Sequence, residues 1–149
     1  MALSTIMAAV QTIVASVTGI TPLIYRYEPW AAQASAVRTA FVHQGRLQTW
    51  TISRRSTVER QLATGHENER TYTLILRAYY ALGSEGQTEE AFQQTLEGVC
   101  AAFRLLPGLN GTAATSEPLQ VDLVEPRMFC EVLCHYAELR LETLEFIIW

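Results

Sequence analysis

Histidines and cysteines are the residues of this chain best suited to binding a metal ion, but their spacing does not favour a site. The three histidines, His43, His66 and His135, lie far apart in the sequence. Cys130, Cys134 and His135 come nearest to a cluster of ligands. A zinc site normally needs a second ligand pair at defined spacing, and the sequence contains none. We therefore expect no metal, and we interpret both thiols as small core residues on one face of a strand.

Motifs for nucleotide binding and for nucleophilic catalysis are also missing. The segment around Gly108 and Gly111 does not match the phosphate-binding pattern G-x-x-x-x-G-K-[ST], and there is no G-x-S-x-G elbow. Asp122 is the single aspartate, and Glu89 and Glu90 suit the first turn of a helix better than a catalytic pair. The sequence therefore predicts a protein that is not an enzyme and has no cofactor.

Length and composition indicate one domain, residues 1–149, that hides part of its surface in contacts with partners. Apolar residues make up 49% of the 149 residues and charged residues only 17%, whereas about a quarter is usual for a soluble domain. The interior of one domain of this size is limited. We therefore expect contacts with partners, rather than an unusually large core, to account for the shortage of charge.

The charge balance argues against a broad basic surface for nucleic acid, because the net charge is −4 and the pI is near 5.4. All 11 basic residues are arginine. This fits a GC-rich genome, and it also fits protein interfaces, where the planar guanidinium pairs with carboxylates. Three cysteines without a secretory signal predict reduced, intracellular thiols. No window approaches the roughly 20 apolar residues of a membrane span, so we expect no membrane partner.

Hydrophobic periodicity predicts an α+β fold. The expected helices cover about 3–17 and 88–105. The expected strands cover about 23–28, 37–43, 47–55 with a continuation to 62, 70–82, 119–125 and 131–147, and loops are expected at 31–36, 63–69 and 110–118. This order predicts a mostly antiparallel β-sheet with a long hairpin, flanked by an N-terminal helix and one central helix. The second face of the sheet is also partly apolar, so we expect either a second sheet or a neighbouring subunit to cover it.

The long hairpin, with its tip near Gly65, is the segment we expect to contact a partner. Strands that protrude past a core cannot bury their own side chains, and arginine and aromatic residues are enriched in interfaces. An ordinary solvated hairpin of mixed charge remains the alternative. The residues of the predicted contact are Trp50, Arg54, Arg55, Arg60, Glu67 and Arg70.

The apolar C-terminus, from Leu144 to Trp149, has two interpretations. It packs into the core as the last strand, or it forms an edge that adds to the sheet of a neighbour. The second interpretation predicts an oligomer edge that contains Phe146 and Trp149.

The order of these elements resembles a family of phage proteins over nearly the whole chain. A short N-terminal helix leads into the first strand, and an arginine-rich hairpin then spans Trp50–Tyr80, with Arg-Thr-Tyr-Thr-Leu from Arg70 on its return strand. A helix begins at the Glu-Glu-Ala-Phe of Glu89, and the last strand contains His-Tyr-Ala-Glu-Leu-Arg-Leu from His135. This pattern is similar to that of the tail terminator, or tail-completion, proteins of long-tailed phages and related tail-like particles.

The resemblance implies a structural virion protein, located in the tail or neck and assembled in the host cytoplasm. It implies a hexameric ring that binds the last ring of tail tube protein, stops tube polymerisation and offers a surface to a neck or connector protein. In contractile tails the ring also contacts the sheath protein. DNA would only pass through the lumen, which an acidic chain favours because bound phosphates need cations.

Two other functions remain open on the sequence. The first is another neck or tail-completion component, which differs from a terminator in not forming a finite ring that caps tubes. The second is a dimeric α+β protein that binds a small molecule, which requires a concave pocket with convergent polar groups.

Overall fold

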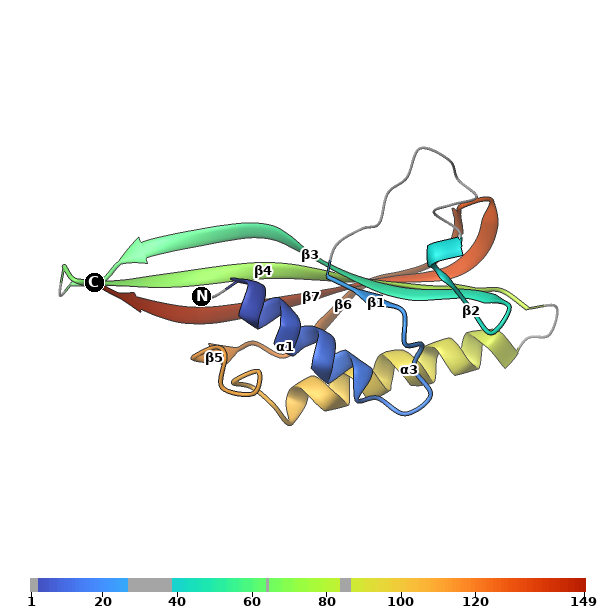
Figure 1. The fold of residues 1–149 in the computed structure, drawn as a ribbon, viewed down its shortest axis with the longest axis horizontal. Coiled ribbons are helices and arrows are strands. Elements are labelled where there is room, and N and C mark those ends of the chain that lie inside the picture. Colours follow the sequence, from blue (N-terminus) through green and yellow to red (C-terminus); the bar gives the residue numbers. More distant parts are fainter. Residues whose placement is uncertain (1–2, 27–38, 64, 84–86) are drawn as a thin grey trace.

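A computed structural model describes residues 3–26, 39–63, 65–83 and 87–149, and it has the predicted α+β fold (Figure 1). The elements are α1 (Leu3–Ala15), β1 (Ile24–Tyr25), β2 (Val42–His43), β3 (Arg46–Gln61), β4 (Glu67–Ala81), α3 (Gln87–Arg104), β5 (Thr115–Ser116), β6 (Gln120–Phe129) and β7 (Val132–Ile148). The strands form one sheet in the order β1-β3-β4-β7-β5, and β2 pairs with β3 while β6 pairs with β7. Both helices lie on the same side of this sheet.

The main core lies between the sheet and the two helices. Alternate residues of a strand point to one face, so Leu74, Leu76 and Ala78 of β4 share the helix-facing side with Leu139 and Leu141 of β7. The residues that the helices bury against them are Ile6, Ala9, Val10, Ile13 and Val14 from α1 and Phe92, Leu96, Val99 and Phe103 from α3. Burying one such side chain contributes about 1.5–3 kcal/mol, so this layer is the main source of stability.

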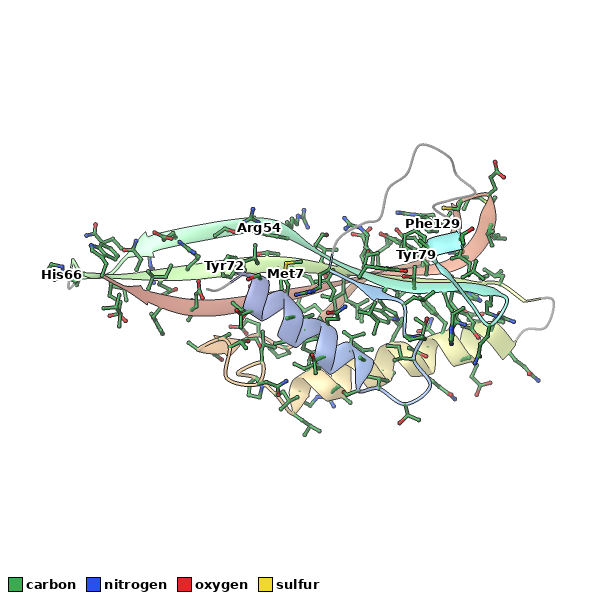
Figure 2. All side chains as sticks on the ribbon, in the orientation of Figure 1. Met7, Arg54, His66, Tyr72, Tyr79 and Phe129 are labelled. Carbon is green, nitrogen blue, oxygen red and sulfur yellow. The ribbon has the colours of Figure 1, made fainter. Side chains whose placement is uncertain are left out.

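A smaller core lies on the opposite face, at the end of the sheet where β6 and β7 curl over (Figure 1). Phe41 is 1% exposed there, and its ring centroid lies 5.2 Å from that of Phe129. Phe129 in turn stacks on Tyr79 at 4.0 Å between centroids (Figure 2). One sheet with two unequal cores therefore replaces the second sheet that the sequence left open.

The first two strands differ from the sequence prediction. The strand expected at 23–28 is limited to Ile24–Tyr25, and it runs parallel to β3, which makes the sheet mixed. Of the strand expected at 37–43, only Val42–His43 is extended, while residues 39 and 40 are helical. This bend inserts Phe41 into the smaller core. Residues 27–28 and 37–38, and the loop expected at 31–36, lie outside the described residues.

Pro126 does not end a strand, although the sequence predicts a break there. β6 continues through it to Phe129, and Pro126 lies opposite His135 of β7. Within the described residues β6 pairs only with β7, and an edge strand tolerates a proline because the missing N–H can face outward. The hairpin tip is also tighter than expected, since β4 begins at Glu67.

No helix in the described part of the chain is long and apolar enough to cross a membrane.

The contact between α3 and the end of α1 depends on Gly98. A β-carbon at this position would lie 3.0 Å from Cγ1 of Val17, although alanine favours a helix by about 1 kcal/mol over glycine. We predict that Gly98→Ala gains this full amount only in a Val17→Ala background, and clearly less in the wild-type chain. Urea unfolding of the four chains measures the coupling, and equal gains in both backgrounds would contradict the close approach.

Candidate partner-binding arm

The sheet extends well past the helices at the hairpin end, where β3, β4 and β7 form a three-stranded arm that carries the C-terminus at its tip (Figure 1). We define the arm as residues 56–61, 67–73 and 142–148. Its strands stay in register to the end, with Gln61 opposite Asn68 and Glu67 opposite Ile148. The backbone N–H of Trp149 also donates to the carbonyl oxygen of His66 at 3.0 Å. The arm is therefore an ordered extension of the sheet.

Both edges of the arm are open within the described residues. β3 pairs with β1 and β2 only as far as Thr51, and from Ile52 onward it pairs with β4 alone. On the other side, β7 pairs with β5 as far as Leu144, and from Glu145 onward it pairs with β4 alone. An open edge presents unpaired N–H and C=O groups, which another strand can bind.

A charged cluster on the helix-facing side crosses all three strands of the arm. Arg70 of β4 lies between Glu59 of β3 and Glu145 of β7, which are its register neighbours. Its Nη2 lies 2.6 Å from Oε1 of Glu59, and its Nη1 lies 3.6 Å from Oε1 of Glu145. Tyr72 receives a hydrogen bond from Arg70 at 3.0 Å and donates one to Glu145 at 2.9 Å. Asn68 also donates to Glu59 at 2.6 Å. We call these five residues the brace.

Burial and charge fix the protonation states of the brace. Hydrogen bonds from Arg70 and Asn68 hold the pKa of the Glu59 carboxyl below its ordinary value of 4.5. Burial raises the pKa of Tyr72 above its usual 10.0, so its hydroxyl stays protonated and can donate. The hydrogen bonds to Tyr72 and Glu59 raise the pKa of Arg70, which remains cationic. The brace therefore joins the three strands through hydrogen bonds in which Arg70 is cationic and the Tyr72 hydroxyl is protonated.

The opposite side of the arm carries exposed apolar side chains on its two outer strands, β3 and β7, with polar residues of β4 between them. Val58 of β3 pairs with Thr71 of β4, which pairs with Leu144 of β7, and the side chains of such a row point to one face. Phe146 lies in the row of Arg60 and Glu69, two residues closer to the tip. The exposed fractions are 63% for Val58, 47% for Phe146 and 76% for Ile148. Large apolar side chains exposed on an ordered surface are a feature of protein contact sites. We call Val58, Leu144, Phe146 and Ile148 the apolar face.

Two arginines stand at the base of the arm, where a β-bulge between Arg54 and Ser56 shifts the register of β3. Arg54 and Arg55 are both exposed, and Arg54 makes only a 3.4 Å contact with the hydroxyl of Thr57. They line a hollow of about 340 Å³ together with Ile75, Arg77 and one acidic residue, Glu138. A cationic, open hollow of this kind suits a carboxylate from another molecule.

The structure brings most of the predicted contact residues together. Arg54, Arg55, Arg60, Glu67 and Arg70 all lie on the arm or at its base, and Arg60 pairs with Glu69 at 3.1 Å. Trp50 is an exception, because it is 3% exposed in the main core and cannot meet a partner in this fold. Of the C-terminal residues, Phe146 and Trp149 are exposed rather than packed into the core.

Sequence reasoning missed the roles of Tyr72 and Glu145. A signal was present in the sequence, because Glu145 alternates in phase with Leu139 and Leu141, which point toward the core. In the structure Glu145 is 7% exposed. A carboxylate at a buried position requires a partner. Which residue supplies that partner depends on the register between β4 and β7, which the sequence does not give.

The described residues contain no group of histidine, cysteine and acidic side chains that could hold a metal ion. Cys134 and His135 point to opposite faces of β7: Cys134 is buried in the smaller core, and His135 lies against Thr88 and Phe92 on the helix side. Burial raises the pKa of Cys134 to about 11. Cys130 does not lie in the strand as expected, because it occupies the turn between β6 and β7 with φ of 50°.

The hollow beside α3 offers little room for a small molecule. Trp50, Tyr79, Tyr80 and Phe92 contribute to its lining, and its volume is about 20 Å³. A single water molecule needs roughly 10–15 Å³ by this measure. This hollow therefore cannot hold a metabolite without rearrangement.

A scan against protein-family models finds no family that matches this chain, and a search of the curated proteins finds no relative.

The hydrogen bonds of the brace predict that removing the Tyr72 hydroxyl lowers the stability of the folded chain. Tyr72→Phe leaves the buried Glu145 without its closest donor, so we expect a loss of about 1–3 kcal/mol in the free energy of unfolding. Tyr80→Phe is the matched control, because the Tyr80 hydroxyl makes no hydrogen bond with the described residues. Urea unfolding measures both variants. A loss in Tyr72→Phe no larger than in the control would contradict the role of the brace.

The lowered pKa of Glu59 predicts a pH dependence. A carboxyl whose pKa is lower in the folded state adds stability above its unfolded pKa, and this contribution disappears as the pH falls through the folded value. We therefore expect Glu59→Gln to lose less stability than the wild type when the pH is lowered from neutral to below the ordinary value of 4.5. Thermal unfolding across this range is the measurement.

Glu67→Gln is the control, since the Glu67 carboxylate forms no ion pair with other described residues. It should follow the wild-type profile. Identical profiles for Glu59→Gln and the wild type would show that Glu59 does not stabilise the folded arm.

Proposed function

We propose that this chain is a structural tail terminator, a subunit that forms a ring, closes the end of a phage tail tube and joins the tail to the neck. The observation that carries the proposal is the apolar face of the arm. Large apolar side chains on an ordered extension of a sheet are the chemistry of a permanent protein contact. They have no corresponding use in an enzyme whose site lies in a pocket.

The arm suits a partner with a repetitive surface that runs along it, such as the wall of the last ring of tail tube subunits. The brace holds the arm in one conformation, so little conformational entropy is lost when it binds. Val58, Phe146 and Ile148 would supply the apolar centre of the contact, and the Arg60–Glu69 pair would lie at its polar rim. The opposite end of the domain would remain for a neck or connector protein and, in a contractile tail, for the sheath protein.

The net charge of −4 agrees with a ring through which DNA passes. Stable binding of DNA requires cations that neutralise phosphates and release counterions. A ring of acidic subunits offers few such groups, so DNA would cross the lumen without being held. In this proposal the protein is located in the virion after assembly in the host cytoplasm.

The alternatives differ in what they require. Another neck or tail-completion component would use the same arm but would not cap tubes at a defined length. A dimeric small-molecule binder would need a concave pocket with convergent polar groups. The hollow beside α3 is too small for that role, and the hollow of about 340 Å³ beside Arg54 and Arg55 is open to solvent. The first alternative is therefore the stronger of the two.

The test is negative-stain electron microscopy of the purified chain mixed with the tube protein encoded beside it. We expect rings on the blunt ends of tubes whose length is limited by the added chain. The double variant Phe146→Ser with Ile148→Ser should remain folded and lose capping, because it removes the centre of the apolar face.

Leu105→Ser provides the matched control. Leu105 is 80% exposed, and it follows the end of α3, outside the residues that define the arm. This variant should cap tubes as the wild type does. Normal capping by the double variant would overturn the arm as the contact surface, and tubes that the wild-type chain leaves uncapped would overturn the terminator function.

A further inference from the structure

The two sides of the arm carry charges of opposite sign at the same level of the sheet. On the β3 side, Arg54 and Arg55 have no described carboxylate within ion-pair distance. On the other side, Glu117 follows β5, and its backbone N–H donates to the carbonyl oxygen of Glu142 at 2.9 Å. Glu117 likewise has no described cationic partner, whereas Glu142 forms an ion pair with Arg140 of its own strand at 3.8 Å.

The register places these charges opposite each other across the sheet. Arg54 lies in the row of Leu74 and Leu141, and Ser56 lies in the next row, with Thr73 and Glu142. Arg55 stands in the bulge between the two rows. Rotation about an axis along the arm moves a copy sideways without shifting it along the arm. Residues at the same position along the arm therefore meet in adjacent copies, and the acidic β7 side of one copy faces the basic β3 side of the next.

Backbone N–H and C=O groups without a described strand partner lie on both sides of the arm, along β3 and along β7. The N–H of Trp50 donates to the carbonyl oxygen of Leu23 at 3.0 Å, so it points away from β4. Backbone direction alternates along a strand, so the N–H and C=O groups of Ile52 and Arg54 face the same open edge. On the opposite side, β7 is open from Glu145 to Ile148.

We propose that copies of this chain join head to tail through the arm, with Arg54 and Arg55 of one copy facing Glu117 and Glu142 of the next. β3 and β7 are both antiparallel to β4, so both run toward the tip. Rotation about an axis along the arm preserves this direction, so β3 of one copy and β7 of the next run parallel. Because β5 and β6 cover β7 up to Leu144, the open edge of β7 is level only with β3 from Glu59 onward, and the β5 side faces Arg54 and Arg55. This inference rests on the proposed ring, and it specifies which surfaces close it.

Two other arrangements are disfavoured by the same residues. A contact in which both copies use the β3 side would place Arg54 and Arg55 against the same arginines, which repel. The outer edge of β6 is blunted, because it contains Pro126 and a register shift between Val121 and Leu123. Proline and bulges are features that prevent strand addition at an edge.

Charge reversal tests the contact by sedimentation velocity over a range of concentrations. The wild type should associate. Arg54→Glu with Arg55→Glu makes both sides acidic, and Glu117→Arg with Glu142→Arg makes both sides basic. Each double variant alone should associate at least about tenfold more weakly than the wild type.

Mixing the two double variants should restore association. In a head-to-tail ring the acidic and basic copies alternate, and every contact then joins opposite charges. A chain that carries all four substitutions should also associate with itself, because its two sides remain complementary. Failure of both the mixture and the fourfold variant to recover would overturn the proposed pairing.

The matched controls change the net charge by the same amount as the arm variants, at positions outside the arm. Arg26→Glu with Arg104→Glu and Glu90→Arg with Glu97→Arg reverse exposed charges elsewhere in the chain. Both should associate as the wild type does. A loss of association in the controls as large as in the arm variants would show an effect of net charge and would contradict the specific contact.

The outcomes for the contact and for the function are separate. A wild-type chain that stays monomeric at every concentration yet caps tubes would overturn this head-to-tail contact and leave the terminator function standing. A chain that forms charge-dependent rings but never caps tubes would support the contact and overturn the terminator function.

Discussion

The structure depends on a mismatch between the length of its strands and the length of its helices. β7 has 17 residues and α3 has 18. A strand rises about 3.3 Å per residue and a helix about 1.5 Å, so these elements span roughly 56 Å and 27 Å. α3 therefore spans about half of the length of β7. The arm follows from this geometry, and beyond Tyr72 its three strands need stabilisation from outside the main core.

The chain meets this need differently on the two faces of the arm. On the helix-facing side the brace replaces apolar packing, with Arg70 between Glu59 and Glu145 and the hydroxyl of Tyr72 linking them. On the other side the apolar residues remain exposed. A protein that acted alone would gain by making that face polar, because each exposed apolar group costs solubility. We interpret its retention as the mark of a contact with other subunits, which also agrees with the low content of charged residues.

The sequence was sufficient for elements whose signals are local. The periodicity of the N-terminal segment and of residues 88–105 placed both described helices within a few residues, and Gly65 marked the hairpin tip. The bend at Phe41 could not be read, because its cause is the distant Phe129 and Tyr79. The burial of Trp50 depends in the same way on helices elsewhere in the chain. The arginines of the hairpin were visible as a group, whereas the brace required the register of β4 against β7.

Hydrogen exchange measured at low and high protein concentration tests the central claim most directly. If neighbouring copies complete the arm, the amides of β3 from Ile52 to Gln61 should exchange more slowly as the concentration rises, while those of α3 should not change. Equal exchange in β3 at every concentration would contradict the claim that the arm is an interface between copies.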